Sequence, residues 1–142
     1  MGSRGLSAAY VDASALVKLF KVERETAAFR SALSEWPVQV ASELIRVEAM
    51  RTARRVGGQD VLERAIAAVE RITLIPISPE IIELATAAHS PSLRAMDAIH
   101  LATALTIRGD LGVFFVYDGD LHAAALAHAL NPLAPTDGFT GR

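Results

Sequence analysis

Short apolar segments alternate along the chain with longer segments that have the apolar spacing of helices, and this alternation limits the possible folds most strongly. The first and the last of the strong apolar segments run directly into an aspartate, Asp12 and Asp118. Strands are expected at residues 8–11, 38–41, 72–77 and 112–117, with an edge strand in the proline-containing tail. Helices are expected at about residues 14–20, 26–35, 42–56, 59–71, 79–89, 93–108 and 121–130.

Strands that alternate with helices predict an α/β fold with a mainly parallel sheet and right-handed crossovers. A chain of 142 residues is expected to form one domain over residues 1–142, large enough to fold without a disulfide or a structural metal. Residues 1–7 are expected to be a flexible start or a remnant of expression. Ligands of such sheets bind at the carboxyl ends of the strands, so Asp12 and Asp118 are expected on one ligand-binding edge.

The absence of cysteine excludes disulfide scaffolds, thiolate zinc sites, iron–sulfur clusters and cysteine nucleophiles. The remaining ligands are carboxylates and four histidines, a set that favours hard cations such as Mg²⁺ or Mn²⁺. A net charge of -2 offers no broad basic surface for nucleic acid. No apolar segment approaches the roughly 20 residues of a membrane helix, and no signal peptide is evident, so we expect a cytoplasmic protein without membrane contact.

Two more acids stand among apolar residues. Asp97 lies near the start of an expected helix that is apolar almost all round, where a charge is seldom buried unless it is paired or bound to metal. Glu48 follows Leu44 by one turn in another helix. Each acid also has an ordinary structural explanation: Asp12 and Asp118 as caps, Asp97 as a first-turn acid, and Glu48 as the partner of Arg51 or Arg55 on a helix surface.

Four segments resemble, in order and spacing, the signature segments of the PIN-domain ribonucleases, and most of all the VapC-like toxins of type II toxin–antitoxin pairs. The segments are Tyr10–Phe20 (YVDASALVKLF), residues 42–49 (SELIRVEA), residues 94–104 (RAMDAIHLATA) and residues 116–118 (VYD). The resemblance extends from about Tyr10 to Pro135. It implies a three-layer α/β/α sandwich whose four acids meet at the carboxyl edge of the sheet.

The resemblance also implies an activity. PIN-domain toxins hydrolyse RNA phosphodiester bonds with water activated by Mg²⁺ or Mn²⁺, and a VapB-like antitoxin holds them inactive. The residues that match the four catalytic acids are Asp12, Glu48, Asp97 and Asp118. Asp12 and Asp97 are expected to bind metal directly, while Ser14 matches a hydroxyl beside the metal. Asp120 competes with Asp118 as the fourth acid, and we favour Asp118.

Hard cations held by carboxylates supply both an activated water and charge compensation, so the chemistry agrees with the resemblance. We therefore expect an endoribonuclease toxin with an RNA substrate, an antitoxin partner and a homodimeric state. The alternative is a catalytically silent PIN-like module that binds RNA or protein. His100 is expected to pack in the core or to orient Asp97. The arginines of residues 46–55 are expected to be either a solvated face or contacts for RNA phosphates or antitoxin acids.

Overall fold

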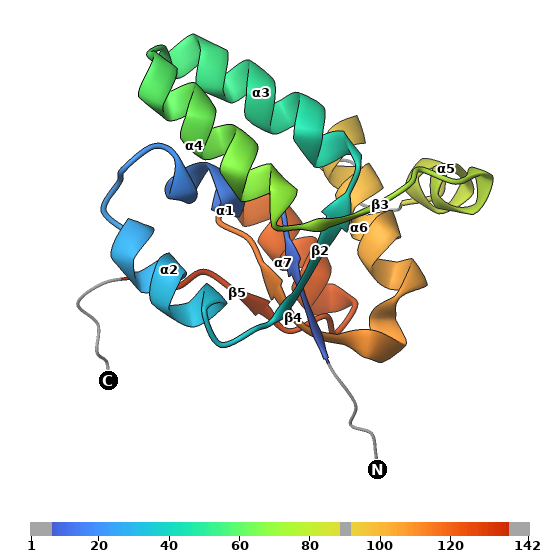
Figure 1. The fold of residues 1–142 in the computed structure, drawn as a ribbon. Helices are drawn as coiled ribbons and strands as arrows, with labels where there is room; N and C mark the ends of the chain where they lie inside the picture. The colour runs from blue at the N-terminus through green and yellow to red at the C-terminus, as the bar shows by residue number, and fades with distance from the viewer. Residues whose placement is uncertain (1–6, 89–91, 137–142) are drawn as a thin grey trace.

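The computed structural model describes residues 7–88 and 92–136 and shows helices on both faces of a single parallel sheet (Figure 1). Five strands make the sheet in the order β3-β2-β1-β4-β5, and every neighbouring pair is parallel. The strands are β1 (Ala8–Val11), β2 (Val38–Ser42), β3 (Thr73–Ile75), β4 (Leu111–Phe115) and β5 (Pro132–Leu133). The expected α/β fold and the expected edge strand are confirmed, and the sheet is wholly rather than mainly parallel.

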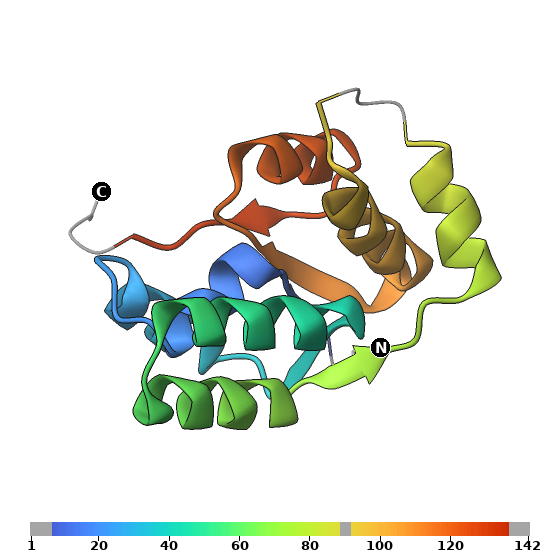
Figure 2. The ribbon, with the colours of Figure 1, turned by 90° about the horizontal axis from the view of Figure 1, so that it is seen from above.

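The helices form two groups on opposite faces of the sheet (Figure 2). The first four, on one face, are α1 (Ala13–Leu16), α2 (Thr26–Leu33), α3 (Leu44–Val56) and α4 (Gln59–Glu70). The last three, on the other, are α5 (Pro79–Thr86), α6 (Ala95–Thr106) and α7 (Gly119–Ala127). Two 3₁₀ turns, η1 (Val17–Leu19) and η2 (Arg108–Asp110), follow α1 and α6. This arrangement is the expected three-layer sandwich.

The hydrophobic core lies around the central strands of the sheet. All four residues of β1 are buried, and the ring of Tyr10 stacks on that of Phe114 with 4.9 Å between centroids. Phe115 packs edge-on against Phe29 of α2, so the sheet and the first helical layer share aromatic contacts. Burial of large apolar and aromatic surfaces is the dominant stabilising contribution to a fold of this kind. The rigid centre of the sheet fixes the place where β1 and β4 end.

The sequence patterns locate most helix ends by their capping chemistry. Ser78 caps α5 through its hydroxyl, and Pro79 is the first helical residue as expected. Gly57 and Gly58 separate α3 from α4 with φ of 90° and 100°, a conformation that favours glycine. The helix expected to end near residue 89 ends at Thr86, and residue 89 itself lies outside the described residues.

The helix expected over residues 14–20 is shorter than predicted. Asp12 caps it, as the structural explanation of that acid predicts, and after Leu16 it tightens into the 3₁₀ turn η1. Two side chains of α2 donate hydrogen bonds to the carbonyls at this end: the Thr26 hydroxyl to that of Lys18, and Arg30 to that of Leu19. Tertiary hydrogen bonds therefore replace the helical ones that a continuous helix would make. The strand expected over residues 72–77 is likewise shorter, at Thr73–Ile75.

Candidate active site

Asp12 stands at the carboxyl end of the central strand, where the chain turns from β1 into α1. Its side chain is 2% exposed, and its Oδ1 accepts hydrogen bonds from the Ser14 hydroxyl (2.7 Å) and the Ala15 amide (3.1 Å). Burial raises the pKa of the Asp12 carboxyl to about 6, although His100 and the hydrogen bonds from Ser14 and Ala15 act in the opposite direction. A carboxylate at this place is costly unless a cation or a proton compensates its charge.

Ser14 joins the end of β1 to the end of β4. Its hydroxyl donates to Asp12 and accepts from the backbone amides of Tyr117 (2.8 Å) and Asp118 (3.1 Å). Asp118 caps α7 by accepting from the Leu121 amide (2.9 Å). The two aspartates therefore end adjacent strands and are linked through one hydroxyl, as the strand pattern predicts for their shared edge.

Asp97 lies in the first turn of α6 and is half-buried. Burial raises the pKa of its carboxyl, and the negative charges of Asp118 and Glu48 raise it further. The charges of His100 and Arg94 oppose this shift. Asp97 is therefore subject to the charges of two other acids at the sheet edge, Asp118 and Glu48, as well as to its own burial.

Glu48 of α3 lies at the same edge and is hydrogen-bonded to a histidine, His100. Its Oε1 lies 2.6 Å from Nε2 of His100, and its side chain is 14% exposed. The expected surface pair with Arg51 or Arg55 is therefore wrong, since the partner of Glu48 is a core residue 52 positions away in the sequence. His100 packs in the core as expected, but the acid that it hydrogen-bonds is Glu48, not Asp97.

The histidine is held from its other side by Tyr10. The Tyr10 hydroxyl lies 2.7 Å from Nδ1 of His100 and accepts from the Ser42 amide (3.0 Å). Burial lowers the pKa of His100, but the hydrogen bond to Glu48 and the nearby acids outweigh burial and raise it overall. Tyr10 was not among the predicted site residues. Its hydroxyl in a wholly apolar strand was the available signal, because buried Tyr O–H groups are normally hydrogen-bonded.

We call the four residues Asp12, Glu48, Asp97 and Asp118 the acid edge. Asp120, the competing candidate, is exposed in the first turn of α7. Within residues 7–88 and 92–136, no three His, Asp or Glu side chains stand close enough together to hold a metal ion as they are placed. Carboxylate oxygens are nevertheless the ligand type that a hard divalent cation prefers, and the positive charge of such a cation would offset the repulsion among the four acids. A cation would have to draw the carboxylates closer together.

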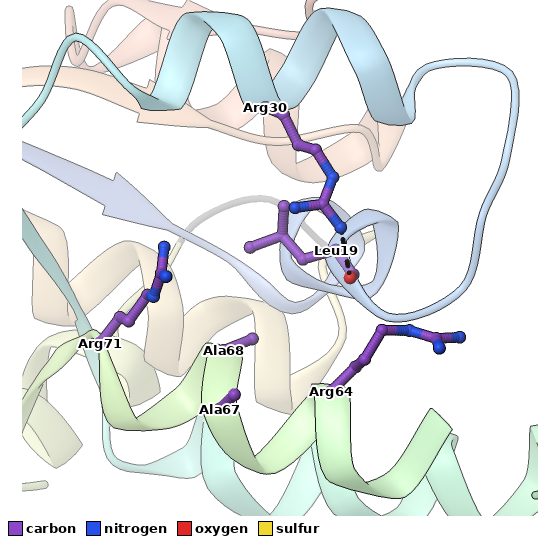
Figure 3. A pocket seen from close by; sticks show the side chains of 6 residues that line it. All are labelled: Leu19, Arg30, Arg64, Ala67, Ala68 and Arg71. Carbon is purple, nitrogen blue, oxygen red and sulfur yellow. Dashed lines mark hydrogen bonds between the residues drawn. The ribbon is translucent and has the colours of Figure 1, made fainter. Parts of the chain in front are cut away.

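A concave surface away from the acid edge lies between η1, α2 and α4. We call it the arginine groove; one cavity of about 180 Å³ is lined by Leu19, Arg30, Arg64, Ala67, Ala68 and Arg71 (Figure 3). An adjoining cavity of about 120 Å³ shares Arg30 and Arg71. Arg30 donates to the carbonyl of Leu19 (3.0 Å), and Arg64 to that of Phe20 (3.2 Å). None of the described residues that line either cavity is acidic.

The basic residues of α3 form a separate surface. Arg46, Arg51, Arg54 and Arg55 are all exposed along this helix, which also carries Glu48.

In the part of the chain that the structure describes, no helix is long and apolar enough to cross a membrane.

Comparison with known proteins agrees with the fold and with the signature segments. The sequence model of the PIN domain matches residues 9–130. Among curated proteins, the chain is 38% identical to Ribonuclease VapC47 of Mycobacterium tuberculosis over 113 residues, which cover 77% of this chain and 83% of that protein. It is 34% identical to Ribonuclease VapC46 of the same species over 131 residues, covering 92% of this chain and all of the relative.

Solved structures agree as well. A toxin–antitoxin complex from Klebsiella pneumoniae contains a chain that is 27% identical, with a TM-score of 0.68 over 89% of this chain and 97% of that one. The VapC20 toxin of Mycobacterium tuberculosis, described as cleaving the sarcin–ricin loop, superimposes with a TM-score of 0.67 at 18% identity. It covers 82% of this chain and 94% of VapC20, and at that identity it supports the fold alone.

Proposed function

Because the chain belongs to the PIN-domain family and, within it, to the VapC ribonucleases, we propose that the acid edge binds Mg²⁺ or Mn²⁺ and hydrolyses RNA there. The chain is an endoribonuclease of the toxin–antitoxin type. The observation that carries the metal proposal is Asp12, a carboxylate 2% exposed at the end of the central strand, bonded by a hydroxyl and an amide. A buried carboxylate in such surroundings favours a cation as its partner.

The residues of the acid edge and Ser14 divide the proposed roles among them. Asp12 and Asp97 would hold the cation directly, since one ends the central strand and the other begins α6. Glu48 and Asp118 complete the negative site. A bound divalent cation supplies an activated water and compensates charge on the phosphoryl oxygens. Ser14 keeps Asp12 oriented and fixes the amides that precede α7.

RNA cleavage with and without metal tests this proposal. Total bacterial RNA is incubated with the wild type, Asp12→Asn, Asp97→Asn and the surface control Asp60→Asn, in EDTA, Mg²⁺ or Mn²⁺. We expect metal-dependent cleavage by the wild type and the control, and a loss of at least a hundredfold in the other two variants. Equal cleavage by all four proteins, or full cleavage in EDTA, would refute the metal mechanism.

A parallel comparison of Asp118→Asn with Asp120→Asn identifies the fourth acid. Asp118 caps α7 and interacts with Asp97, whereas Asp120 is exposed. We expect the first substitution to abolish cleavage and the second to leave it within threefold. The reverse order would assign the fourth position to Asp120. Substituting Asp118 by asparagine retains a capping side chain, so the comparison isolates the charge.

The arginine groove supports a proposal for the partner. It combines three arginines with an apolar floor of Leu19, Ala67 and Ala68, which suits a peptide carrying both acidic and apolar side chains. We assign this groove to an acidic segment of the antitoxin. The exposed arginines of α3 lie on the helix that carries Glu48, and we assign them to RNA phosphates.

Growth assays separate the two basic surfaces. Expression of the wild type should arrest growth, and co-expression of the cognate antitoxin should restore it. Alanine at all three groove arginines should leave the arrest intact and abolish the rescue. Alanine at the α3 arginines should weaken the arrest and lower RNA cleavage. If the groove variant is rescued as well as the wild type, the antitoxin docks elsewhere.

Two further expectations belong to this proposal. We propose a cytoplasmic location, since an RNA-cleaving toxin must meet RNA there. The homodimer stays a prediction, and light scattering of the purified protein tests it directly.

A further inference from the structure

Four groups from four different elements form a continuous chain of hydrogen bonds that ends at Glu48. The Ser42 amide of β2 donates to the Tyr10 hydroxyl of β1 (3.0 Å). That hydroxyl lies 2.7 Å from Nδ1 of His100 in α6, and Nε2 of His100 lies 2.6 Å from Oε1 of Glu48 in α3. The chain thus connects the backbone of the sheet to one member of the acid edge.

The imidazole is fixed in place by its surroundings. His100 is 1% exposed, and the Tyr10 ring meets it edge-on with 5.8 Å between centroids. Tyr10 is itself wholly buried and stacked on Phe114, so its hydroxyl has little freedom to move. For Glu48 Oε1 to accept this hydrogen bond, the hydrogen must lie on Nε2 of His100, and that arrangement is the one the inference requires.

Glu48 needs such an anchor more than Asp12 and Asp118 do. Asp12 and Asp118 are short side chains held by the capping of α1 and α7. A glutamate on a helix has three rotatable side-chain bonds, so holding it in one conformation costs side-chain entropy. A preformed hydrogen bond from a buried ring supplies that order before any ligand arrives.

We infer that His100, backed by Tyr10, is a positioning residue that holds the Glu48 carboxylate at the acid edge. This inference rests on the proposed metal site. In this role His100 acts only through Glu48 and does not contact the substrate. A histidine that only filled the core could bond Nε2 to any buried acceptor; here the acceptor is an acid that is 14% exposed and belongs to the acid edge.

Calorimetric titration of the metal-free protein with Mn²⁺ tests this role without relying on activity. His100→Leu should weaken Mn²⁺ binding about tenfold, as is usual when the partner of a metal ligand is removed. His100→Gln, whose amide nitrogen can donate from the position of Nε2, should recover most of that loss. His128→Gln, an exposed histidine at the far end of α7, serves as the matched control and should bind Mn²⁺ like the wild type.

A double-mutant cycle shows whether His100 acts through Glu48. Glu48→Gln alone should weaken Mn²⁺ binding, and His100→Leu should add nothing in that background. An equal effect of His100→Leu in both backgrounds, or none in the wild type, would overturn the inference while the metal site stands. If neither Asp12→Asn nor Glu48→Gln changes Mn²⁺ binding, the proposed function itself fails.

Nitrogen-15 spectra of the imidazole give a second readout, independent of metal. In the wild type, Nε2 should carry a slowly exchanging hydrogen, and that signal should broaden in Glu48→Gln because the acceptor is weakened. An unprotonated Nε2 at neutral pH would overturn the inference. Should His100→Leu fail to fold, His100→Gln and Tyr10→Phe carry the test, with an expected loss in Mn²⁺ affinity of about threefold for Tyr10→Phe.

Discussion

Asp12→Asn should stabilise the metal-free protein at neutral pH, although Asp12 is the residue most central to the proposed activity. Burial raises the pKa of Asp12 from an ordinary 3.8 to about 6. A pKa that is higher in the folded state means that the folded protein holds its proton more tightly. The resulting stabilisation is fully present below pH 3.8 and is lost as the pH rises through about 6.

The size of the effect follows from the two pKa values. A shift from 3.8 to about 6 corresponds to a loss of about 3 kcal/mol at pH 7 relative to acid pH. Asparagine carries no charge, and its Oδ1 can still accept from Ser14 and Ala15. After the cost of burying the new amide group, we expect Asp12→Asn to raise the free energy of unfolding by about 2 kcal/mol. In a chain of this size that gain raises the melting temperature by about 6 °C.

Thermal unfolding in EDTA at pH 7 and pH 4 measures the prediction, with Asp60→Asn as the surface control. The stability advantage of Asp12→Asn should be present at pH 7 and nearly vanish at pH 4, and the control should change by less than about 0.5 kcal/mol. Saturating Mn²⁺ should reverse the order, because the variant lacks a carboxylate of the proposed metal site and a ligand stabilises only the protein that binds it. A melting temperature equal to or below that of the wild type at pH 7 in EDTA would refute the reasoning.

Substitutions at three further positions test the hydrogen bonds, packing and ion pairs around the site. Ser14→Ala removes a hydroxyl that makes three hydrogen bonds, so urea unfolding should show a loss of about 2 kcal/mol, with Ser14→Thr retaining more stability. Gly112→Ala would place a Cβ 2.5 Å from the Trp36 ring. We expect this clash to destabilise the fold by about 1–3 kcal/mol and to shift the tryptophan fluorescence, and an unchanged spectrum would contradict this. Lys18→Met removes two ion pairs of 2.8 and 2.9 Å, and the loss of about 1 kcal/mol should shrink in high salt; a salt-independent loss would indicate packing instead.

Local sequence patterns predict the acids that end strands better than the acid that sits mid-helix. Asp12 and Asp118 follow apolar strands directly, and parallel strands bring their carboxyl ends to one edge whatever the details of packing. Their capping roles were also foreseeable, since aspartate at a helix start is common. Both roles coexist in the structure: Asp12 caps α1 with the same carboxylate that the acid edge uses.

The surroundings of Glu48 could not be predicted in this way. Helical spacing favoured Arg51 or Arg55 as its partner, because those residues lie one or two turns along the same helix. The actual partner, His100, reaches it only after α3 and α6 have packed at the edge of the sheet. Periodicity describes the faces of one helix, whereas this contact depends on how two helices on opposite faces of the sheet approach each other.

The position of β1 has a consequence for how the protein is made. β1 is paired on one side with β2 and on the other with β4, which begins at residue 111. Asp12 and Asp118 come together only when β4 has paired with β1. A nascent chain therefore carries an incomplete acid edge until β4 has left the ribosome. The ribosome that makes this nuclease, and the message it reads, are not exposed to the finished site before that point.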